Sequence, residues 1–272
     1  MRTPPRSEWS NRPNAYGLMS HGGTPNLMGV PHFHDDIELN FIERGAMTYL
    51  LGRHEFTIQA GHWLAFWAAL PHRVIWVDAD TRQHWLYVPL PLFLQWELPQ
   101  AFVDDILQGN PVIDPHCAQP AADHGIFEQW HADIQASERG RSRAALLEIE
   151  ARLRRMALNR TLPDRGAQPV DPGVSFARAR QIALFIAGHY TDPLTVADIA
   201  GEIGLHPNYA MKIFRDHFNT SIGEYLTRYR VAHAQRLLAT TDQRVLDIAL
   251  ASGFGSSSRF YPAFKHACGQ TP

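Results

Sequence analysis

The chain has 272 residues, 45% hydrophobic and 19% charged, which fits a soluble globular protein of two domains and excludes a disordered or fibrous one. Its two cysteines, Cys117 and Cys268, lie far apart, which argues against a disulfide framework and indicates a reducing, cytoplasmic location. The net charge is −2, but residues from Asp171 onward carry ten Lys and Arg against eight Asp and Glu, a small positive excess.

Nothing in the hydrophobic pattern predicts a membrane role. The first ten residues are polar and contain prolines, unlike a signal peptide. The most hydrophobic segments, around residues 63–70 and 85–96, are short and interrupted by His or Pro, so neither can span a bilayer as a helix.

Residues from about 30 to 88 have the pattern of short strands. Alternating runs at Ile37–Glu43, Met47–Leu51 and Glu55–Gln59 are separated by single glycines. Many short strands at this spacing predict a small antiparallel barrel or jelly roll, covering about residues 25–100.

The barrel region contains the pattern His-x-His-x3-Glu at His32, His34 and Glu38, with His72 after a later glycine-started strand. This set resembles the metal motif of cupin barrels, and three imidazoles with one carboxylate suit Zn, Mn, Fe or Ni. Three interpretations stay open: ligands for a divalent transition metal, contacts for a small organic effector that needs no cofactor, or a structural role.

Tryptophans are frequent in the same region, at Trp63, Trp67, Trp76 and Trp85. Indole faces stack on the apolar faces of sugar rings, while His and Glu bind hydroxyl groups. We therefore count Trp67 and Trp85 with the four His and Glu residues as candidate effector contacts; packing in the core is the alternative for each tryptophan.

From about residue 124 to 160 the period becomes helical, with a break at Gly140. The two predicted apolar faces consist of Ile126, Phe127, Trp130 and Ile134, and of Leu146, Ile149, Leu153 and Met156. The second face is a seam that packs on another helix. Covering its own barrel and forming a homodimer are the alternatives for this pair, and the two can coexist. Residues 1–161 form the predicted first domain, and the Pro- and Gly-rich stretch 162–174 is the predicted linker.

Residues 175–272 are helical in pattern, and they open with a helix-turn-helix. Thr195 with Asp198 is an N-cap signature, Gly204 permits the turn, and Pro207 opens the next helix. The residues predicted to face inward are Val196, Ile199, Ile203, Tyr209, Ile213 and Phe214. The residues predicted to face outward from the second helix are Asn208, Met211 and Lys212.

The same arrangement recurs forty-nine residues later, with Ile248-Ala249 in place of Ile199-Ala200 and Gly253 in place of Gly204. Here Ser256 is the predicted cap, Phe260 and Phe264 face inward, and Ser257, Ser258 and Arg259 face outward. A predicted helix at Ile222–Ala239, roughly 27 Å long, joins the units. Successive major grooves on one side of DNA lie roughly 34 Å apart, so this helix holds two recognition helices at about the required separation.

The segments LTVADIAGEIGLHPNYAMKIF and DIALASGFGSSSRFYPAFKHACGQTP resemble the DNA-binding region of the AraC family of transcription regulators. The upstream segments GHWLAFWAALPH and LPLFLQWEL extend the resemblance over most of the chain. It implies an α+β fold, with an N-terminal cupin-like β-barrel and helical pair, and a C-terminal all-α domain of two helix-turn-helix motifs. Two features depart from the family: Pro262 lies inside the second recognition helix, and the chain stops at Pro272, where members usually continue.

The resemblance also implies functions for particular residues. Asn208, Met211 and Lys212 take the base-reading positions of the first unit, and Ser257, Ser258 and Arg259 those of the second. Trp85 becomes the first candidate for a sugar platform, and an α-galactoside the first candidate sugar. DNA, RNA polymerase and a second copy of the chain are the implied partners.

The expected function is therefore a ligand-responsive transcription activator, not an enzyme. Two alternatives remain at this point: a metal-dependent cupin enzyme with a helical appendage, and a DNA-binding dimer whose barrel binds no ligand. Because Pro262 removes a backbone hydrogen bond and should bend its helix, we expect the first unit to dominate specific DNA reading.

Overall fold

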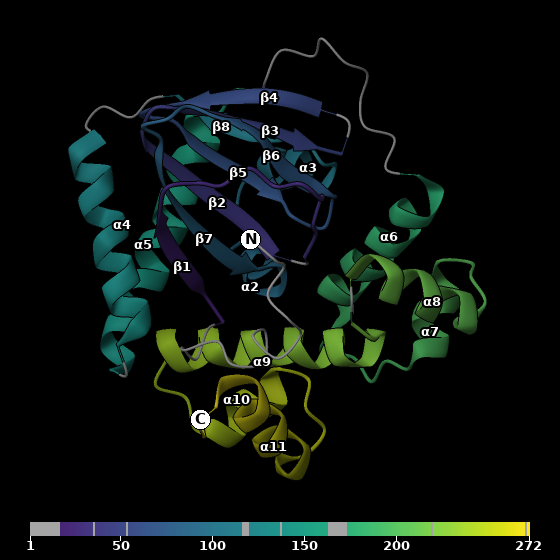
Figure 1. The fold of residues 1–272 in the computed structure, drawn as a ribbon. Coiled ribbons are helices and arrows are strands. Elements are labelled where there is room, and N and C mark those ends of the chain that lie inside the picture. Colours follow the sequence, from purple (N-terminus) through teal and green to yellow (C-terminus); the bar gives the residue numbers. More distant parts are fainter. Residues whose placement is uncertain are drawn as a thin grey trace. The chain divides into compact units, whose positions relative to one another are not determined.

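The computed structural model describes residues 17–34, 36–52, 54–115, 120–136, 138–162, 173–218, 220–269 and 271–272, which form two compact units (Figure 1). Among the described residues, the strands belong to the first unit, and the second unit contains Pro91–Gln95 together with the helices that follow residue 172. Of the predicted linker, residues 163–172 lie outside the described residues. Within the described part of the chain, no helix combines the length and the apolar character needed to cross a membrane.

The first unit is built on two antiparallel sheets. In their side-by-side order, the strands of the larger sheet are β1 (Met19–Gly23), β7 (Arg82–Pro89), β2 (Asp36–Arg44), β5 (Trp63–Trp67) and β8 (Val112–Asp114). Those of the smaller sheet are β4 (His54–Gln59), β3 (Ala46–Leu51) and β6 (His72–Val77). The three strands predicted from alternation are thus confirmed as β2, β3 and β4.

The register of the larger sheet decides which side chains share a face. Glu38 of β2 lies opposite Phe66 of β5 and Tyr87 of β7, whereas Ile37 lies opposite Trp67 and Val88. Cross-strand partners point to the same side of a sheet, and neighbours along a strand point to opposite sides. The sheet therefore has one face that carries Glu38 and another that carries Trp67.

The face that carries Trp67 is covered by helices. Phe127 and Trp130 of α4 (Pro120–Gln135) pack against Trp63 of β5, and the Trp63 indole donates to Asp123 over 2.8 Å. Arg152 of α5 (Arg139–Asn159) binds the buried carboxylate of Asp114 on β8 at 2.9 Å. Helix α3 (Gln100–Leu107) also belongs to the first unit, whereas α2 (Leu90–Gln95) belongs to the second from Pro91 on.

The helical pair corrects two sequence expectations. Helix α4 ends at Gln135 and α5 begins at Arg139, so the predicted break at Gly140 is wrong and Gly140 lies inside the first turn of α5. Ile126 is exposed, although the rest of its predicted face is buried. The seam of α5 is buried within the unit, where α5 packs on α4 as the sequence predicts; dimerisation through another face of the pair stays a prediction. The seam residues are Leu146, Ile149, Leu153 and Met156.

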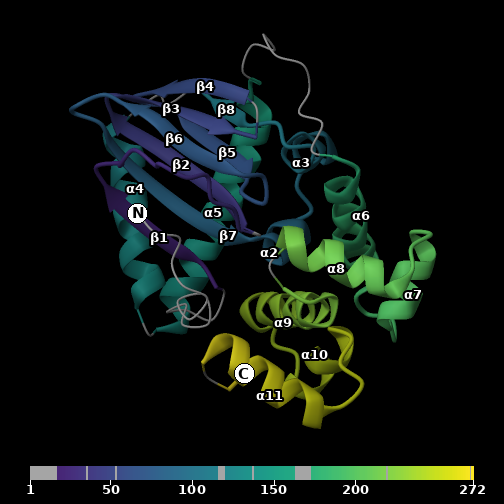
Figure 2. The same ribbon diagram turned by 45° about the vertical axis from the view of Figure 1, so that its right-hand side comes forward.

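The second unit is entirely helical. Its helices are α6 (Val174–His189), α7 (Val196–Glu202), α8 (Pro207–Phe218), α9 (Ile222–Thr240), α10 (Val245–Ala251) and α11 (Ser257–Cys268). Helix α9 contacts α6 and α8 as well as α10 and α11, and it runs between these two groups (Figure 2). The predicted joining helix is thus confirmed as α9. A capping box between Ser221 and Glu224 stabilises its N-terminus.

The two helix-turn-helix units repeat each other down to single hydrogen bonds. Leu205 N–H donates to the Ala200 carbonyl over 2.9 Å, and forty-nine residues later Phe254 N–H donates to Ala249 over 3.1 Å. Gly204 and Gly253 hold the left-handed backbone that this closure needs, with φ of 68° and 83°. The predicted capping box of Thr195 and Asp198 is present.

Four side chains of these units differ from expectation. Tyr209 is exposed rather than inward, and Val196 and Ile203 are only half-buried. Ser256 occupies the N-cap position of α11 but makes no side-chain capping bond there. Helix α11 runs continuously across Pro262.

The two turn glycines should tolerate alanine unequally. A Cβ at Gly204 meets nothing within 4 Å, whereas one at Gly253 would lie 2.6 Å from the Tyr190 carbonyl oxygen. Gly204→Ala should therefore cost only left-handed strain, about 1–2 kcal/mol, and Gly253→Ala should add a clash of about 1–3 kcal/mol. Urea unfolding of both variants measures the difference, and equal losses would contradict it.

Candidate functional site

Four side chains with ligating atoms meet inside the first unit: His32, His34, Glu38 and His72. These residues, called here the His–Glu cluster, place one nitrogen or oxygen each within 4.8 Å of all the others. His32 and His72 exchange two backbone hydrogen bonds of 3.0 and 2.9 Å, which join the segment before β2 to the start of β6. The folded chain thus brings together the four residues that the sequence pattern singled out.

Two of the imidazoles are held in a fixed orientation. The Nδ1 atom of His72 donates to the Leu70 carbonyl over 2.9 Å, and Nδ1 of His34 lies 3.1 Å from a carboxylate oxygen of Asp36. Because Nδ1 serves these partners, Nε2 of each ring is left to face Glu38, with Nε2 to Oε2 distances of 3.4 Å for His72 and 3.5 Å for His34. Metal-binding histidines are commonly oriented by such partners.

The other carboxylate oxygen of Glu38, Oε1, also has a hydrogen-bond partner. Asn40 donates to Glu38 Oε1 over 3.2 Å, and the Tyr49 hydroxyl donates to the Asn40 amide oxygen over 3.3 Å. Burial by itself would lower the pKa of His34, but bonds to the Asp36 and Glu38 carboxylates outweigh it and raise that pKa to about 9. Burial would raise the pKa of Glu38, yet His34 and His72 hold it well below its usual range.

The His–Glu cluster is therefore charged, buried and convergent. His34, Glu38 and His72 are each nearly inaccessible to solvent, and Glu38 keeps its carboxylate charge. Anionic oxygen and imidazole nitrogen aimed at one point form a donor set for a cation such as Zn, Mn, Fe or Ni, which would displace the proton of His34 on binding. With ligating atoms this close together, the space between them suits an ion better than a sugar ring.

Trp67 and Trp85 lie on opposite faces of the larger sheet. Trp67 is fully buried on the helix-covered face, opposite to Glu38, so its position argues against a shared site with the His–Glu cluster. Trp85 lies opposite Asn40 and therefore shares the face of Glu38. It is half-buried, and the His21 ring stacks on it with centroids 5.5 Å apart. Of the two tryptophans predicted to contact an effector, only Trp85 keeps a suitable position.

The predicted base-reading residues lie on the second helix of each helix-turn-helix. Asn208, Met211 and Lys212 are exposed on α8; Ser258 and Arg259 are exposed on α11, where Ser257 is half-buried. Lys212 pairs with Asp216 at 2.9 Å, but both side chains are well exposed, so the pair is weak and easily exchanged for a DNA contact.

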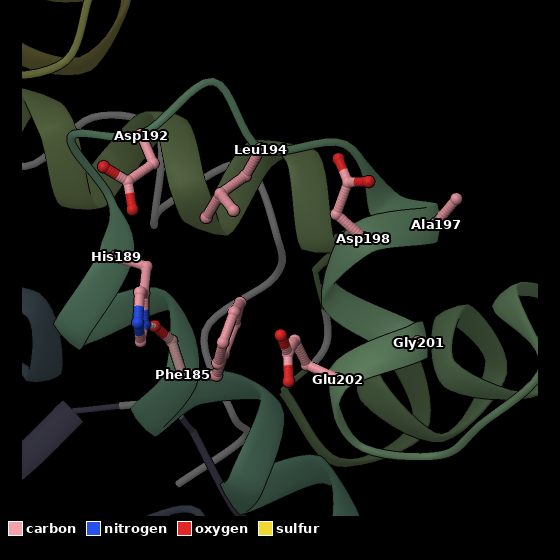
Figure 3. Close-up of a pocket in the computed structure, with 8 residues that line it drawn as sticks. All are labelled: Phe185, His189, Asp192, Leu194, Ala197, Asp198, Gly201 and Glu202. Atoms are coloured by element: carbon pink, nitrogen blue, oxygen red, sulfur yellow. Dashed lines mark hydrogen bonds between the residues drawn. The ribbon is translucent and has the colours of Figure 1, made fainter.

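A shallow hollow of about 650 Å³ lies between α6 and α7 (Figure 3). Asp192, Asp198 and Glu202 bring three carboxylates to its lining. Asp198 is already engaged, because it accepts the Thr195 N–H over 2.8 Å. Carboxylates repel the DNA backbone, so this hollow is unsuited to phosphate.

A second group of ligating side chains escaped sequence reasoning. Glu43, His84 and His124 also place their ligating atoms within 4.8 Å of one another. Glu43 lies at a bulge in β2 and His84 lies on β7, and His124 lies in α4, forty residues after His84. No spacing rule connects residues on β2, β7 and α4, so only the folded structure brings them together.

Comparison with known proteins assigns both units. Residues 22–157 match the model of the AraC-like ligand binding domain, and residues 199–272 match a helix-turn-helix domain. The chain is 32% identical to the melibiose operon regulatory protein of Escherichia coli K12 over 91% of its own length and 83% of that protein. It is 24% identical to the Msm operon regulatory protein of Streptococcus mutans, over 89% and 84% of the two chains.

A solved structure supports the fold. The crystal structure of the AraC-like transcriptional activator CuxR aligns with a TM-score of 0.55 and 14% identity, covering 88% of this chain and 82% of that one. The predicted architecture, an N-terminal β-rich domain followed by a helical helix-turn-helix domain, is confirmed.

Proposed function

The chain belongs to the AraC family of DNA-binding transcription regulators, and we propose that it is an activator that responds to a sugar bound in its first unit. The observation that carries the proposal is the repeated helix-turn-helix of the second unit. Two exposed recognition faces, on α8 and α11, are joined by the single helix α9. One chain can thus read two neighbouring segments of major groove.

The sugar proposal rests on Trp85 and on one relative. An indole that is half-buried on a polar face, with His21 stacked on it, offers a sugar an apolar platform beside hydrogen-bonding groups. The melibiose operon regulatory protein is named for an α-galactoside operon and covers most of this chain. An α-galactoside is therefore the first sugar class to test.

For the His–Glu cluster we propose a bound divalent transition metal rather than direct contact with the sugar. The supporting observation is the fixed orientation of His34 and His72, whose Nε2 atoms converge on one oxygen of Glu38 at 3.5 and 3.4 Å. When bound, the ion would neutralise buried carboxylate charge and stabilise the segment before β2 against β6. No catalytic step is assigned to it, and the protein is not an enzyme in this proposal.

The proposed partners are double-stranded DNA, a second copy of the chain and RNA polymerase, all in the cytoplasm. Sugar binding would shift the balance between arrangements of the two DNA-binding units of a dimer on adjacent sites. A cupin enzyme offers no explanation for the repeated helix-turn-helix, and a ligand-free dimer offers none for the half-buried Trp85.

DNA reading is tested by a gel-shift series on DNA upstream of the neighbouring operon. Lys212→Ala should weaken specific binding about fivefold or more, since a good contact with guanine is worth about 1–3 kcal/mol. Arg259→Ala should weaken it less, because Pro262 deprives α11 of one backbone hydrogen bond. Arg143→Ala removes an exposed charge from the first unit and is the control. A complex that resists salt, or a larger effect of Arg259→Ala, would contradict these expectations.

Sugar binding is tested by thermal shift. Melting temperature should rise with the concentration of an α-galactoside, because a ligand that binds only the folded state stabilises it. Trp85→Ala should abolish the rise by removing the platform. Trp76→Ala should keep it, since Trp76 is an exposed tryptophan on β6. If Trp85→Ala responds as the wild type does, Trp85 is not the platform.

Metal binding at the His–Glu cluster is tested by the same melting curve after treatment with a chelator. Adding Zn²⁺ or Co²⁺ should raise the melting temperature by several degrees, and the rise should be smaller in His72→Ala, which lacks a ligand of the cluster. Metal analysis of the dialysed protein supplies the occupancy. A cluster that takes up no metal would be a buried ion-pair network instead.

A further inference from the structure

A compact group of three ligating side chains lies on the helix-covered face of the larger sheet. His84 of β7 is the cross-strand partner of Phe41 on β2, and Glu43 follows Phe41 by two residues, at a bulge in β2. His124 reaches the same point from the first half of α4. Bulges commonly re-aim a side chain, and this one accompanies a carboxylate that meets two imidazoles.

The three ligating atoms form a nearly equilateral triangle. Glu43 Oε2 lies 3.1 Å from His84 Nε2 and 3.3 Å from His124 Nδ1, and the two nitrogens are 3.1 Å apart. Around a tetrahedral zinc ion with ligands at about 2.0 Å, neighbouring ligand atoms are separated by about 3.3 Å. The triangle therefore already has the dimensions of three corners of such a coordination shell.

Hydrogen bonds among these three atoms cannot satisfy all of them at once. Each ring nitrogen carries at most one hydrogen. If both nitrogens donate to the carboxylate, two N–H groups face each other at 3.1 Å. If one nitrogen donates to the other, its single hydrogen is used and the accepting nitrogen has none, so neither nitrogen has an N–H left for Glu43. A metal ion at the centre accepts a lone pair from all three atoms at once.

The surroundings hold His84 in the ligating orientation. Its ring stacks on Phe127 of α4 with centroids 5.4 Å apart, and a Cβ at Gly22 would come within 2.7 Å of its Nδ1 atom. A carboxylate oxygen of Glu128 lies 3.6 Å from that Nδ1, on the side away from the triangle. Metal-bound histidines are commonly oriented by such an outer carboxylate.

We propose that Glu43, His84 and His124 bind a divalent transition metal ion, zinc in the first instance, which fastens α4 to the larger sheet. Two nitrogens and one oxygen leave a fourth position open, as in zinc sites that also hold water or a small ligand. The partial exposure of Glu43 and His124, 21% and 37% of their side chains, gives solvent access to that position. Arg82 Nε lies 3.3 Å from Glu43 Oε2, the proposed ligand atom; because the Arg82 side chain is half-exposed, this ion pair is weak and can be exchanged for a metal ion.

This site is separate from the His–Glu cluster and does not depend on the proposed function. The two groups lie on opposite faces of β2, because Glu38 faces one way and Phe41 and His84 the other. Loss of one site therefore leaves the ligands of the other intact, and their occupancies can be counted separately.

The test is zinc binding to chelator-treated full-length protein, counted by metal analysis after dialysis. His124→Ala should lose one bound ion per chain relative to the wild type, and His84→Ala should lose the same ion. His131→Ala is the matched control: His131 is another α4 histidine, bonded to Ser20 of β1, and lies outside the triangle. His72→Ala removes the His–Glu cluster without touching this triangle.

Hydrogen exchange supplies a readout of the helix itself. Zinc should slow amide exchange along α4 at least tenfold in the wild type, in His131→Ala and in His72→Ala, and should leave it unchanged in His124→Ala. Unchanged zinc content in His124→Ala, or zinc-independent exchange of α4 in the wild type, overturns the proposal. Loss of an ion only in His72→Ala would assign the metal to the His–Glu cluster and also overturn it.

Discussion

The first unit depends on a strand that is buried on both faces. β2 is inaccessible from Asp36 to Ile42, so each polar side chain on it must find its partner inside the protein. Glu38 does so with two imidazoles and Asn40, and Asn40 in turn accepts from Tyr49. On the other face the same strand meets only rings and aliphatic chains until Glu43, where the bulge begins. A central strand that carries charge in its interior thus produces two groups of ligating side chains, one on each face.

In the second unit the constraint is the closing turn rather than a buried charge. Each helix-turn-helix requires a left-handed residue at the end of its first helix, and glycine adopts that conformation without strain. The repeated backbone bond, from Leu205 to Ala200 and from Phe254 to Ala249, closes the same turn in both copies. The second helix then starts at Pro207 in the first copy and at Ser257 in the second, fifty residues later, so the second copy has one more residue before its recognition helix. The copies also differ in packing, because Gly253 has the Tyr190 backbone against it, whereas a Cβ at Gly204 would meet nothing within 4 Å.

Features set by local periodicity were predictable, and features set by distant neighbours were not. The alternation of β2, β3 and β4, the capping box of α7 and the inward Phe260 and Phe264 depend on adjacent residues, and the structure has them as expected. Trp67 was assigned to the effector site because aromatic residues gather there, but the pairing of β2 with β5 turns it to the opposite face. Tyr209 is predicted to face inward, yet its side chain is exposed. The triangle of Glu43, His84 and His124 needs two strands and a helix to meet, which no spacing in one sequence encodes.

The nearly balanced charge of the second unit also has a structural explanation. Of its seven acidic residues, Asp198 and Glu224 are the third residues of capping boxes, and Asp247 holds the matching position in the first turn of α10. Carboxylates in the first turn of a helix can accept from backbone N–H groups that have no partner within the helix, and they interact favourably with the positive end of the helix dipole. They stabilise helix starts and take no part in the recognition faces, where Lys212 and Arg259 are exposed. The net charge of the chain is therefore a poor guide to DNA binding. Acidic residues that lower it stabilise helix starts, and the basic residues proposed to read DNA lie elsewhere on the unit.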